Sequence, residues 1–210
     1  MPLKSALTAL VIIAGLLVSP VSLYALEQVK SQRDKALVSS NPNDPCFAGC
    51  APYGVPWHFG AIDALPAWER TTGSSDVTIA VVDTGIDTQH PDLLGRVTRI
   101  PGCGLGPTNS YDTSHGTFIA GLIGAVADNS IGTTGLDWKA ELLDVRVMNG
   151  GNGSTQVIAS GIKCAAANGA DIISLSFVQQ GSQLSPILKE AIYEAQKAGS
   201  LVVAAAGNDG

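Results

Sequence analysis

The segment Ile79–Asp87 reads I-A-V-V-D-T-G-I-D, and its apolar half decides the fold. It overlaps the run Val77–Val82, whose continuous apolar or β-branched character is typical of a strand buried on both faces of a parallel sheet. We interpret three later runs in the same way, namely Leu142–Val147, Ile172–Phe177 and Leu201–Ala206. The sequence therefore predicts one sheet built from these buried strands.

Helical patterns accompany the predicted strands, beginning with a short helix at Ile62–Trp68. A second helix begins near His115 and has an apolar face made by Phe118, Ile119, Leu122, Ile123 and Val126. A third has a face made by Val157, Ile158, Gly161, Ile162 and Ala165. A fourth, Pro186–Ala198, has Ser185 as its N-cap and Gly199 just past its end. Alternating strands and helices form right-handed βαβ units, so the predicted fold class is α/β, a doubly wound, mostly parallel sheet flanked by helices.

The composition excludes several classes of protein. Hydrophobic residues make up 45% of the chain and charged residues 14%, which indicates a folded protein rather than a disordered one. The formal net charge is −6 and Lys and Arg form no run, so no nucleic-acid partner is expected. We expect a monomer.

The N-terminus has the organisation of a secretory signal peptide. Lys4 precedes the apolar stretch Ala6–Val18, and Leu23-Tyr24-Ala25 is an acceptable cleavage site. The alternative is an uncleaved anchor, but this stretch is shorter than the roughly 20 residues that span a bilayer. We therefore expect residues 1–25 to be removed, 26–50 to form an N-terminal segment, and 51–210 to fold. The mature protein would be secreted or periplasmic, without stable membrane insertion.

Export makes the four cysteines candidates for disulfides, because disulfides persist outside the cytosol. Cys46 and Cys50 flank a short F-A-G stretch. A local disulfide between them is preferred to a zinc site, which would lack a second pair of ligands. Cys103 lies in a loop rich in Gly and Pro, and Cys164 is predicted to be a small buried hydrophobic residue in a helix.

Polar side chains follow two of the predicted strands. Asp83 comes directly after the first, and Asn208 comes after the last with one glycine between, so both should lie where the carboxyl ends of parallel strands meet. His115 opens an apolar helix that should pack behind that edge, a context that His58 and His90 lack. A carboxylate beside an imidazole is the orienter and base of a nucleophilic hydrolase.

Three motifs occur in one order along the chain, D-T-G-I-D with H-P-D-L, then H-G-T-x-x-A-G, then A-A-A-G-N-D-G. Together they resemble the subtilisin-like serine proteases, most closely the thermitase-like secreted bacterial members. The resemblance implies that Asp83 orients the imidazole, that His115 is general base and then acid, and that Asn208 donates to the oxyanion. The alternative for Asn208 is a residue that serves its turn. The resemblance also implies polypeptide substrates, and Gly116 would let a substrate backbone approach.

The same resemblance places an extended substrate between two edges, Gly151–Ser154 and Ser176–Val178. Phe177 and Val178 stand where the family usually has Leu and Gly. A Val side chain would narrow the pocket for the residue before the cleaved bond, so the family's substrate preference does not carry over to this chain. Phe118 replaces a second His of the family, and we expect little effect from that change.

Calcium is the cofactor that the resemblance implies. The loop Ala127–Thr133 resembles the calcium loop of the family, and hard cations take oxygen ligands that include backbone carbonyls. The expected ligands are the side chains of Asp44, Asp92 and Asn129 and the carbonyls of Ala127, Ile131 and Thr133. The alternative is a polar turn that binds no ion.

The nucleophile of the family, a serine in G-T-S-M-A, does not occur in this sequence, and neither Ser154 nor Ser160 is a credible substitute. We expect the N-terminal portion of a serine endopeptidase that lacks its C-terminal part and an inhibitory pro-domain, and that is nearly inactive alone. One alternative is a catalytically dead relative that binds peptides or partners. Another is a nucleotide-binding domain, although the glycines of Gly102–Gly106 are expected to follow no strand and open no helix.

Overall fold

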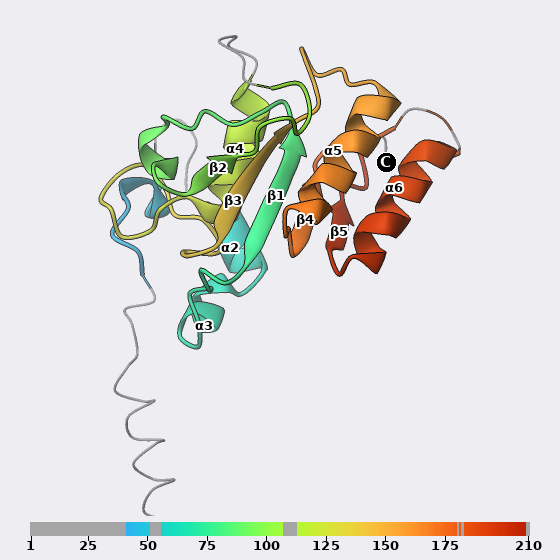
Figure 1. Cartoon of the computed structure of the whole chain (residues 1–210). Coiled ribbons are helices and arrows are strands. Elements are labelled where there is room, and N and C mark those ends of the chain that lie inside the picture. The colour runs from blue at the N-terminus through green and yellow to red at the C-terminus, as the bar shows by residue number, and fades with distance from the viewer. Residues whose placement is uncertain (1–40, 51–55, 107–112, 180, 182, 209–210) are drawn as a thin grey trace, which may run out of the picture. The chain divides into compact units, whose positions relative to one another are not determined.

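A computed structural model describes residues 41–50, 56–106, 113–179, 181 and 183–208. The predicted signal peptide, residues 1–25, lies outside the described residues, as does most of the N-terminal segment 26–50. The described helices are α2 Trp57–Ala61, α3 Ala64–Trp68, α4 Ser114–Gly124, α5 Thr155–Ala167 and α6 Pro186–Lys197, with the short 3₁₀ turns η1 Pro45–Phe47 and η2 Pro91–Leu93 (Figure 1). None of the helices in this part of the chain has both the length and the apolar character needed to cross a bilayer.

The sheet is parallel, as predicted, and has the strand order β2-β3-β1-β4-β5. Its strands are β1 Thr78–Asp83, β2 Val97–Arg99, β3 Glu141–Arg146, β4 Ile172–Leu175 and β5 Leu201–Ala204. The sequence did not predict β2, because three residues at a sheet edge carry no apolar run. Gly102–Gly106 therefore does follow a strand, but Leu105 N donates to the carbonyl of Arg146 and the segment opens no helix.

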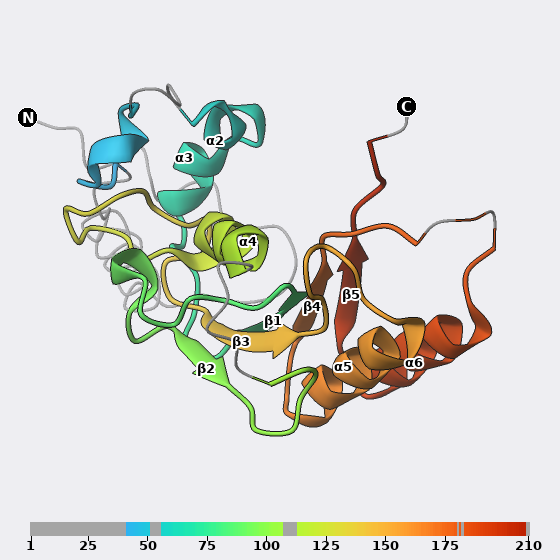
Figure 2. The ribbon, with the colours of Figure 1, turned by 90° about the horizontal axis from the view of Figure 1, so that it is seen from above.

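Helices cover both faces of the sheet, which confirms the doubly wound fold. The helices α5 and α6 lie on one face and α4 lies on the other (Figure 2). Alternate residues of β1 supply two separate cores, Ala80 and Val82 toward α5 and Ile79 and Val81 toward α4. A strand between two cores must be apolar at every position, and this requirement explains the continuous run from which β1 was predicted.

The packed face of α4 agrees only in part with the predicted one. Phe118 is 63% exposed, whereas the buried residues of the helix are Gly116, Ala120 and Gly124. A Cβ at Gly124 would lie 3.3 Å from the side chain of Leu142 on β3, so the helix approaches the sheet too closely for a large residue there. Ile119 and Ile123 of the predicted face do pack against the core, but Phe118 does not, because side-chain size decides which residues of α4 lie closest to the sheet.

No described segment covers the face of β4 and β5 that lies on the side of α4. Leu201 and Val203 pair in register with Ile172 and Ser174, and Ile172 packs into the core on that side. Leu201 is 59% exposed and Val203 is 50% exposed. Figure 2 accordingly shows α4 over β1 and β3 but no described helix over β4 and β5 on the same side. An apolar patch therefore lies beside α4.

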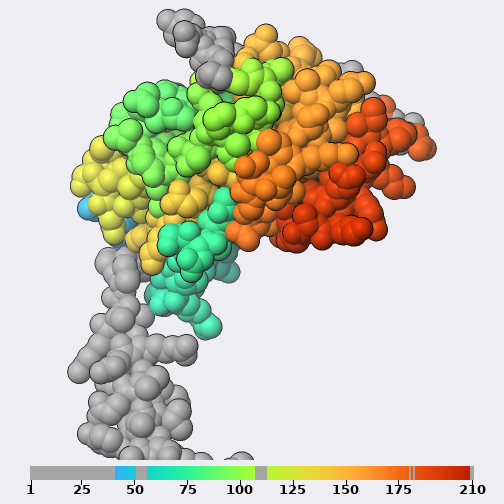
Figure 3. All heavy atoms as spheres, viewed as in Figure 1, coloured from blue at the N-terminus to red at the C-terminus, as the bar shows by residue number. Residues whose placement is uncertain are grey.

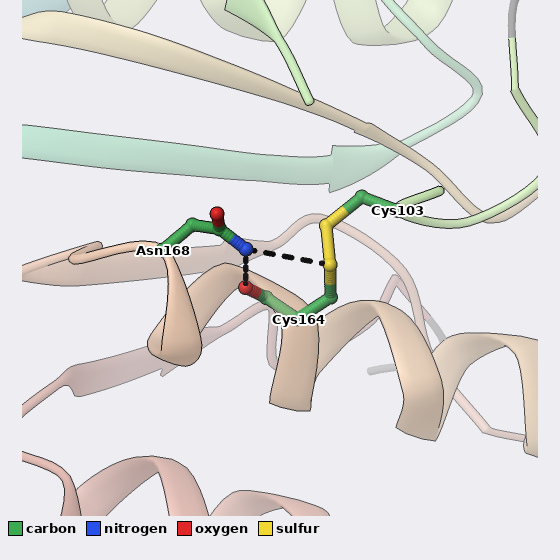
Figure 4. The surroundings of a disulfide bond; sticks show 3 residues. All are labelled: Cys103, Cys164 and Asn168. Atoms are coloured by element: carbon green, nitrogen blue, oxygen red, sulfur yellow. Dashed lines mark hydrogen bonds between the residues drawn. A yellow bond between two sulfur atoms is a disulfide. The ribbon is translucent and has the colours of Figure 1, made fainter. Parts of the chain in front are cut away.

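All four cysteines form disulfides. Cys46 pairs with Cys50, which confirms the predicted local bond and contradicts a zinc site. Cys103 pairs with Cys164, 61 residues along the chain, so the interpretation of Cys164 as a buried hydrophobic residue was wrong (Figure 4). The loop after β2 packs directly against α5, as Figure 3 shows, and this tertiary contact brings the two cysteines together.

Candidate active site

An acid and an imidazole meet at the carboxyl end of β1. Asp83 is the last residue of that strand and is 1% exposed. His115 is the second residue of α4, and its Nδ1 lies 2.7 Å from Asp83 Oδ1. The structure therefore joins two residues that are 32 positions apart, as the sequence predicted.

The carboxylate of Asp83 decides which nitrogen of His115 faces it as a hydrogen-bond donor. An ionised carboxylate only accepts hydrogen bonds, so Nδ1 of His115 is the donor in this contact, and Nε2 of a neutral ring then keeps a free lone pair. The His115 side chain is 52% exposed, which leaves the outer edge of the ring accessible. Asp83 Oδ2 is shielded from solvent and receives no hydrogen bond from the described residues, so both of the donors that reach this carboxylate share Oδ1.

The turn after Asp83 is tied to the start of α4. Thr84 N donates to Asp83 Oδ1 over 2.7 Å, and Thr84 Oγ1 accepts from Gly116 N over 3.1 Å. Asp87 N donates to Thr117 Oγ1 over 2.9 Å. These bonds fix the first turn of the helix relative to the strand end, and with it the distance between the carboxylate and the ring.

Gly116 permits a close approach within the chain itself. A Cβ at this position would lie 2.3 Å from the carbonyl oxygen of Gly85, closer than real Cβ contacts come. Gly116 is also buried. Its lack of a side chain therefore serves the contact between α4 and the turn after Asp83, which corrects the expectation that it makes room for a substrate backbone.

Sequence reasoning missed three charged residues beside this turn. Arg99, Asp144 and Arg146 contact the backbone of Thr84 or Ile86. Burial raises the pKa of Asp144, although hydrogen bonding and the charge of Arg99, followed by weaker effects, act in the opposite direction. The available signal was the pair of charges inside the otherwise apolar run of β3.

Asn208 lies four residues beyond β5, at the same edge of the sheet as Asp83. It is exposed, and no hydrogen bond joins its side chain to Asp83, His115 or any other described residue. Its amide is therefore free to donate to a ligand. The structure places Asn208 at the shared edge but does not bring it into contact with the acid and the imidazole.

The predicted substrate edges lie at the ends of β3 and β4. Ser176–Val178 follows β4, with Phe177 packed against the core and Val178 51% exposed. A Cβ built on Gly207 would lie 3.2 Å from Cγ1 of Val178, so this side chain borders the segment that leads to Asn208. A pocket of about 260 Å³ lies beside these residues, and Phe177 and Val178 both line it.

The other edge, Gly151–Ser154, follows β3. A bridge pairs Asn149 with Asn152, and Gly151 has a positive φ of 77°. Ser154 is the N-cap of α5, and its Oγ accepts from Val157 N over 3.3 Å. The hydroxyl of Ser154 is thus engaged in capping a helix, whereas the backbone before it remains exposed.

The predicted calcium ligands come together from three segments. Asp44 and Asp92 are 2% and 3% exposed, and neither forms an ion pair with a described basic side chain. Asp44 accepts from Asp128 N and Asn129 N, at 3.0 and 3.2 Å. Asp92 accepts from Asn129 Nδ2 and Thr133 N, at 2.9 and 2.8 Å. Two buried carboxylates therefore share one loop without a cationic partner.

The backbone of the same loop offers further oxygens. The carbonyls of Ala127, Ile131 and Thr133 accept no hydrogen bond from the described residues. The Asn129 side chain currently turns its nitrogen toward Asp92, and its oxygen accepts from Ile131 N over 2.8 Å. The described part of the chain contains no cluster of three or more His, Cys, Asp or Glu side chains that could hold a metal. The donor set fits a hard cation only when the carbonyls take part.

Comparison with known proteins agrees with this geometry. The sequence model of the subtilase family matches residues 74–210. Thermitase from Thermoactinomyces vulgaris is 42% identical over 173 residues, which cover 80% of this chain and 58% of thermitase. Subtilisin Savinase from Lederbergia lenta is 40% identical over 159 residues, which cover 74% of this chain and 56% of that protein. The chain thus spans less than two thirds of the length of either relative.

Solved structures give the same result for the fold. A protease from Pseudoalteromonas arctica superposes with a TM-score of 0.67 at 30% identity, covering 80% of this chain and 60% of that protein. A prenylagaramide maturation protease superposes with a TM-score of 0.59 at 28% identity, covering 70% of this chain and 51% of that protein.

Proposed function

This chain belongs to the subtilase family, and from that premise we propose that it supplies the acid and the base of a serine endopeptidase. The observation that carries the proposal is the 2.7 Å contact between His115 Nδ1 and Asp83 Oδ1. The contact leaves Nε2 as a free acceptor on an exposed edge of the ring. A base that is oriented in this way can take the proton of a hydroxyl nucleophile.

The proposed reaction is acyl transfer to a serine and then to water. His115 Nε2 takes the proton of the serine hydroxyl as its oxygen attacks the peptide carbonyl, and then gives that proton to the leaving amine. Asp83 stabilises the imidazolium that forms between these steps. Asn208 would donate its amide to the oxyanion, an interaction worth about 3 kcal/mol in subtilisin.

The serine must come from polypeptide that is not among the described residues, where no hydroxyl contacts His115 Nε2. We propose that this polypeptide packs on the uncovered face of β4 and β5. Leu201, Val203 and Phe118 are large, exposed apolar residues on that side of the sheet. A helix seated there would bury them and lie next to the start of α4.

A complementation experiment tests this function. The chain is refolded together with the remaining portion of thermitase, which carries the serine motif, and hydrolysis of a fluorogenic peptide is followed. We expect turnover that requires both parts and is lost in the His115→Ala variant. If the two parts form a correctly folded complex and the mixture still does not hydrolyse the peptide, the result would favour a catalytically dead relative that binds peptides. The chain alone should hydrolyse the peptide no faster than its His115→Ala variant.

We also propose calcium as a structural cofactor of this chain. Asp44, Asp92 and the Asn129 oxygen would hold it together with the carbonyls of Ala127, Ile131 and Thr133, after the Asn129 amide turns its oxygen inward. When bound, the cation would neutralise two buried carboxylates and rigidify the loop. Within the described residues no cationic side chain forms an ion pair with Asp44 or Asp92, which supports this proposal.

Export is the last part of the proposed function. Residues 1–25 would direct secretion and be removed after Ala25. The two disulfides support an oxidising compartment, because such bonds are rare in the cytosol. N-terminal sequencing of the exported chain should begin at Leu26, and a chain that retains Met1 would contradict cleavage.

A further inference from the structure

Two charged residues lie in the interior of the sheet without a part in the proposed reaction. Asp144 and Arg146 alternate on β3, and they are 1% and 9% exposed. Arg99, at the end of the neighbouring strand β2, points its Nε at Asp144 Oδ2 over 2.6 Å. Burying charges in this way is costly, so the arrangement requires a physical reason.

The ion pair holds Ile86, in the turn after Asp83, at both of its backbone polar groups. Asp144 Oδ1 accepts from Ile86 N over 3.1 Å. Arg99 Nη2 donates to the carbonyl of Ile86 over 2.9 Å. The pair therefore fixes Ile86 from both sides, and neither side chain alone could satisfy the two groups.

Arg146 holds the same turn one peptide earlier. Its Nε donates to the carbonyl of Thr84 over 3.2 Å, and Gly85 lies against its aliphatic stem. The backbone from Thr84 to Ile86 is thus held by side chains of β2 and β3. Because Gly85 O in turn contacts the start of α4 at Gly116, any shift of this turn moves both the carboxylate and the imidazole.

The segment that carries Arg99 is itself anchored. Cys103, four residues later, is bound covalently to Cys164 on α5 (Figure 4). Leu105 N donates to the carbonyl of Arg146 over 2.7 Å. The end of β2 is therefore fixed to both the sheet and a helix, which gives Arg99 a rigid base from which to hold the turn.

We propose that Arg99 and Asp144 are positioning residues, which keep the turn after Asp83 in place and so hold the imidazole of His115 in the tautomer protonated at Nδ1. The effect on catalysis rests on the proposed function. The effect on the tautomer does not, because it depends only on the contact between Asp83 and His115. A simple structural ion pair would affect stability alone.

Nitrogen NMR of the labelled chain separates these two roles, since the ¹⁵N shifts of a neutral imidazole report which nitrogen carries the proton. Arg99→Met leaves Asp144 buried and unpaired, so this variant should be strongly destabilised. The double variant Arg99→Met, Asp144→Leu removes both charges and should recover part of the stability that Arg99→Met loses, since the Ile86 N–H and carbonyl still lack their partners. We expect the ratio of the Nε2–H to the Nδ1–H tautomer of His115 to rise roughly tenfold in the double variant, equivalent to about 1.4 kcal/mol.

The exposed ion pair between Lys163 and Glu194 supplies the control, because it joins α5 to α6 away from this turn. Lys163→Gln should leave both the tautomer ratio and the stability unchanged. A folded double variant with the tautomer ratio of the parent would overturn the proposal and leave the pair a structural role. A parent whose His115 carries its proton mainly on Nε2 would overturn it as well. Failure of the complementation experiment alone would instead count against the peptidase function.

Discussion

Single atoms decide whether the acid and the imidazole can meet. Gly116 lies between His115 and the turn that follows Asp83, and the carbonyl of Gly85 occupies the place that a Cβ at Gly116 would fill. Gly121, on the same helix, has no atom within 4 Å of its own Cβ position. Gly116 and Gly121 thus differ in their physical role, although the motif H-G-T-x-x-A-G contains both.

We predict that Gly116→Ala lowers the free energy of unfolding by about 1–3 kcal/mol, because the methyl group must displace the backbone of Gly85. Urea denaturation followed by circular dichroism measures the change. Gly121→Ala is the matched control and should stabilise the chain by about 0.5–1 kcal/mol, since alanine is the better helix residue in open space. Equal stability of the two variants would show that α4 does not press on this turn.

The buried carboxylate of Asp144 makes a second prediction at this scale. Because burial raises its pKa, the folded chain binds this proton more tightly than the unfolded chain does. Such a group contributes most below its ordinary pKa of 3.8, and the contribution is lost as the pH rises through the higher value of the folded state. The free energy of unfolding of the parent, relative to Asp144→Asn, should therefore fall from acidic pH toward neutrality. If the free energy of unfolding of the parent, relative to Asp144→Asn, rises with pH instead, the attraction of Arg99 for the carboxylate outweighs the effect of burial on its pKa.

At the scale of helices and strands, the sequence predicted the positions of the strands better than it predicted which residues pack together. The apolar runs placed β1, β3, β4 and β5, and the run is continuous in β1, which lies between two cores. The prediction for the packed face of α4 was right for Ile119 and Ile123 and wrong for Phe118, which is exposed. The edge strand β2 had no pattern of its own, and the bond of Cys103 to Cys164 depends on how its loop returns to α5.

The two disulfides should contribute unequally to stability. The bond from Cys103 to Cys164 closes a loop of 61 residues, and the bond from Cys46 to Cys50 spans four. In the chain-entropy model, replacing both cysteines of the longer loop by alanine costs about 4 kcal/mol, against about 2 kcal/mol for the shorter one. Urea denaturation of the two double variants measures both values. An equal loss in both would show that the cost does not come from loop closure.

Across the whole molecule, the candidate site was predictable where local pattern and parallel topology determine position. Asp83 and His115 follow from a strand end and a helix start, and the fold brings them together. The hydrogen bonds that Arg99 and Asp144 form with the backbone of Ile86 could not be predicted, because they require the pairing of β2 with β3. The sequence of β2 has no pattern that predicts a strand. The sequence feature that indicated these contacts was the pair of charged residues, Asp144 and Arg146, within the buried strand β3.

The loop that we propose to bind calcium connects distant parts of the chain, so a metal bound there should affect global stability. Asp44 of the N-terminal segment contacts residues 84 and 85 positions later, and Asp92 contacts Asn129 and Thr133. Calcium at a hundredfold excess over its dissociation constant would stabilise the fold by about 2.7 kcal/mol and raise the melting temperature. We predict that Asp92→Asn loses most of this rise, measured by calorimetry with calcium and with a chelator. Asp128→Asn, which removes an equal charge from the same loop without removing a proposed ligand, should keep it. A melting temperature of the parent that does not respond to calcium would remove the metal from this loop and leave its two carboxylates held by backbone N–H groups and the Asn129 amide alone.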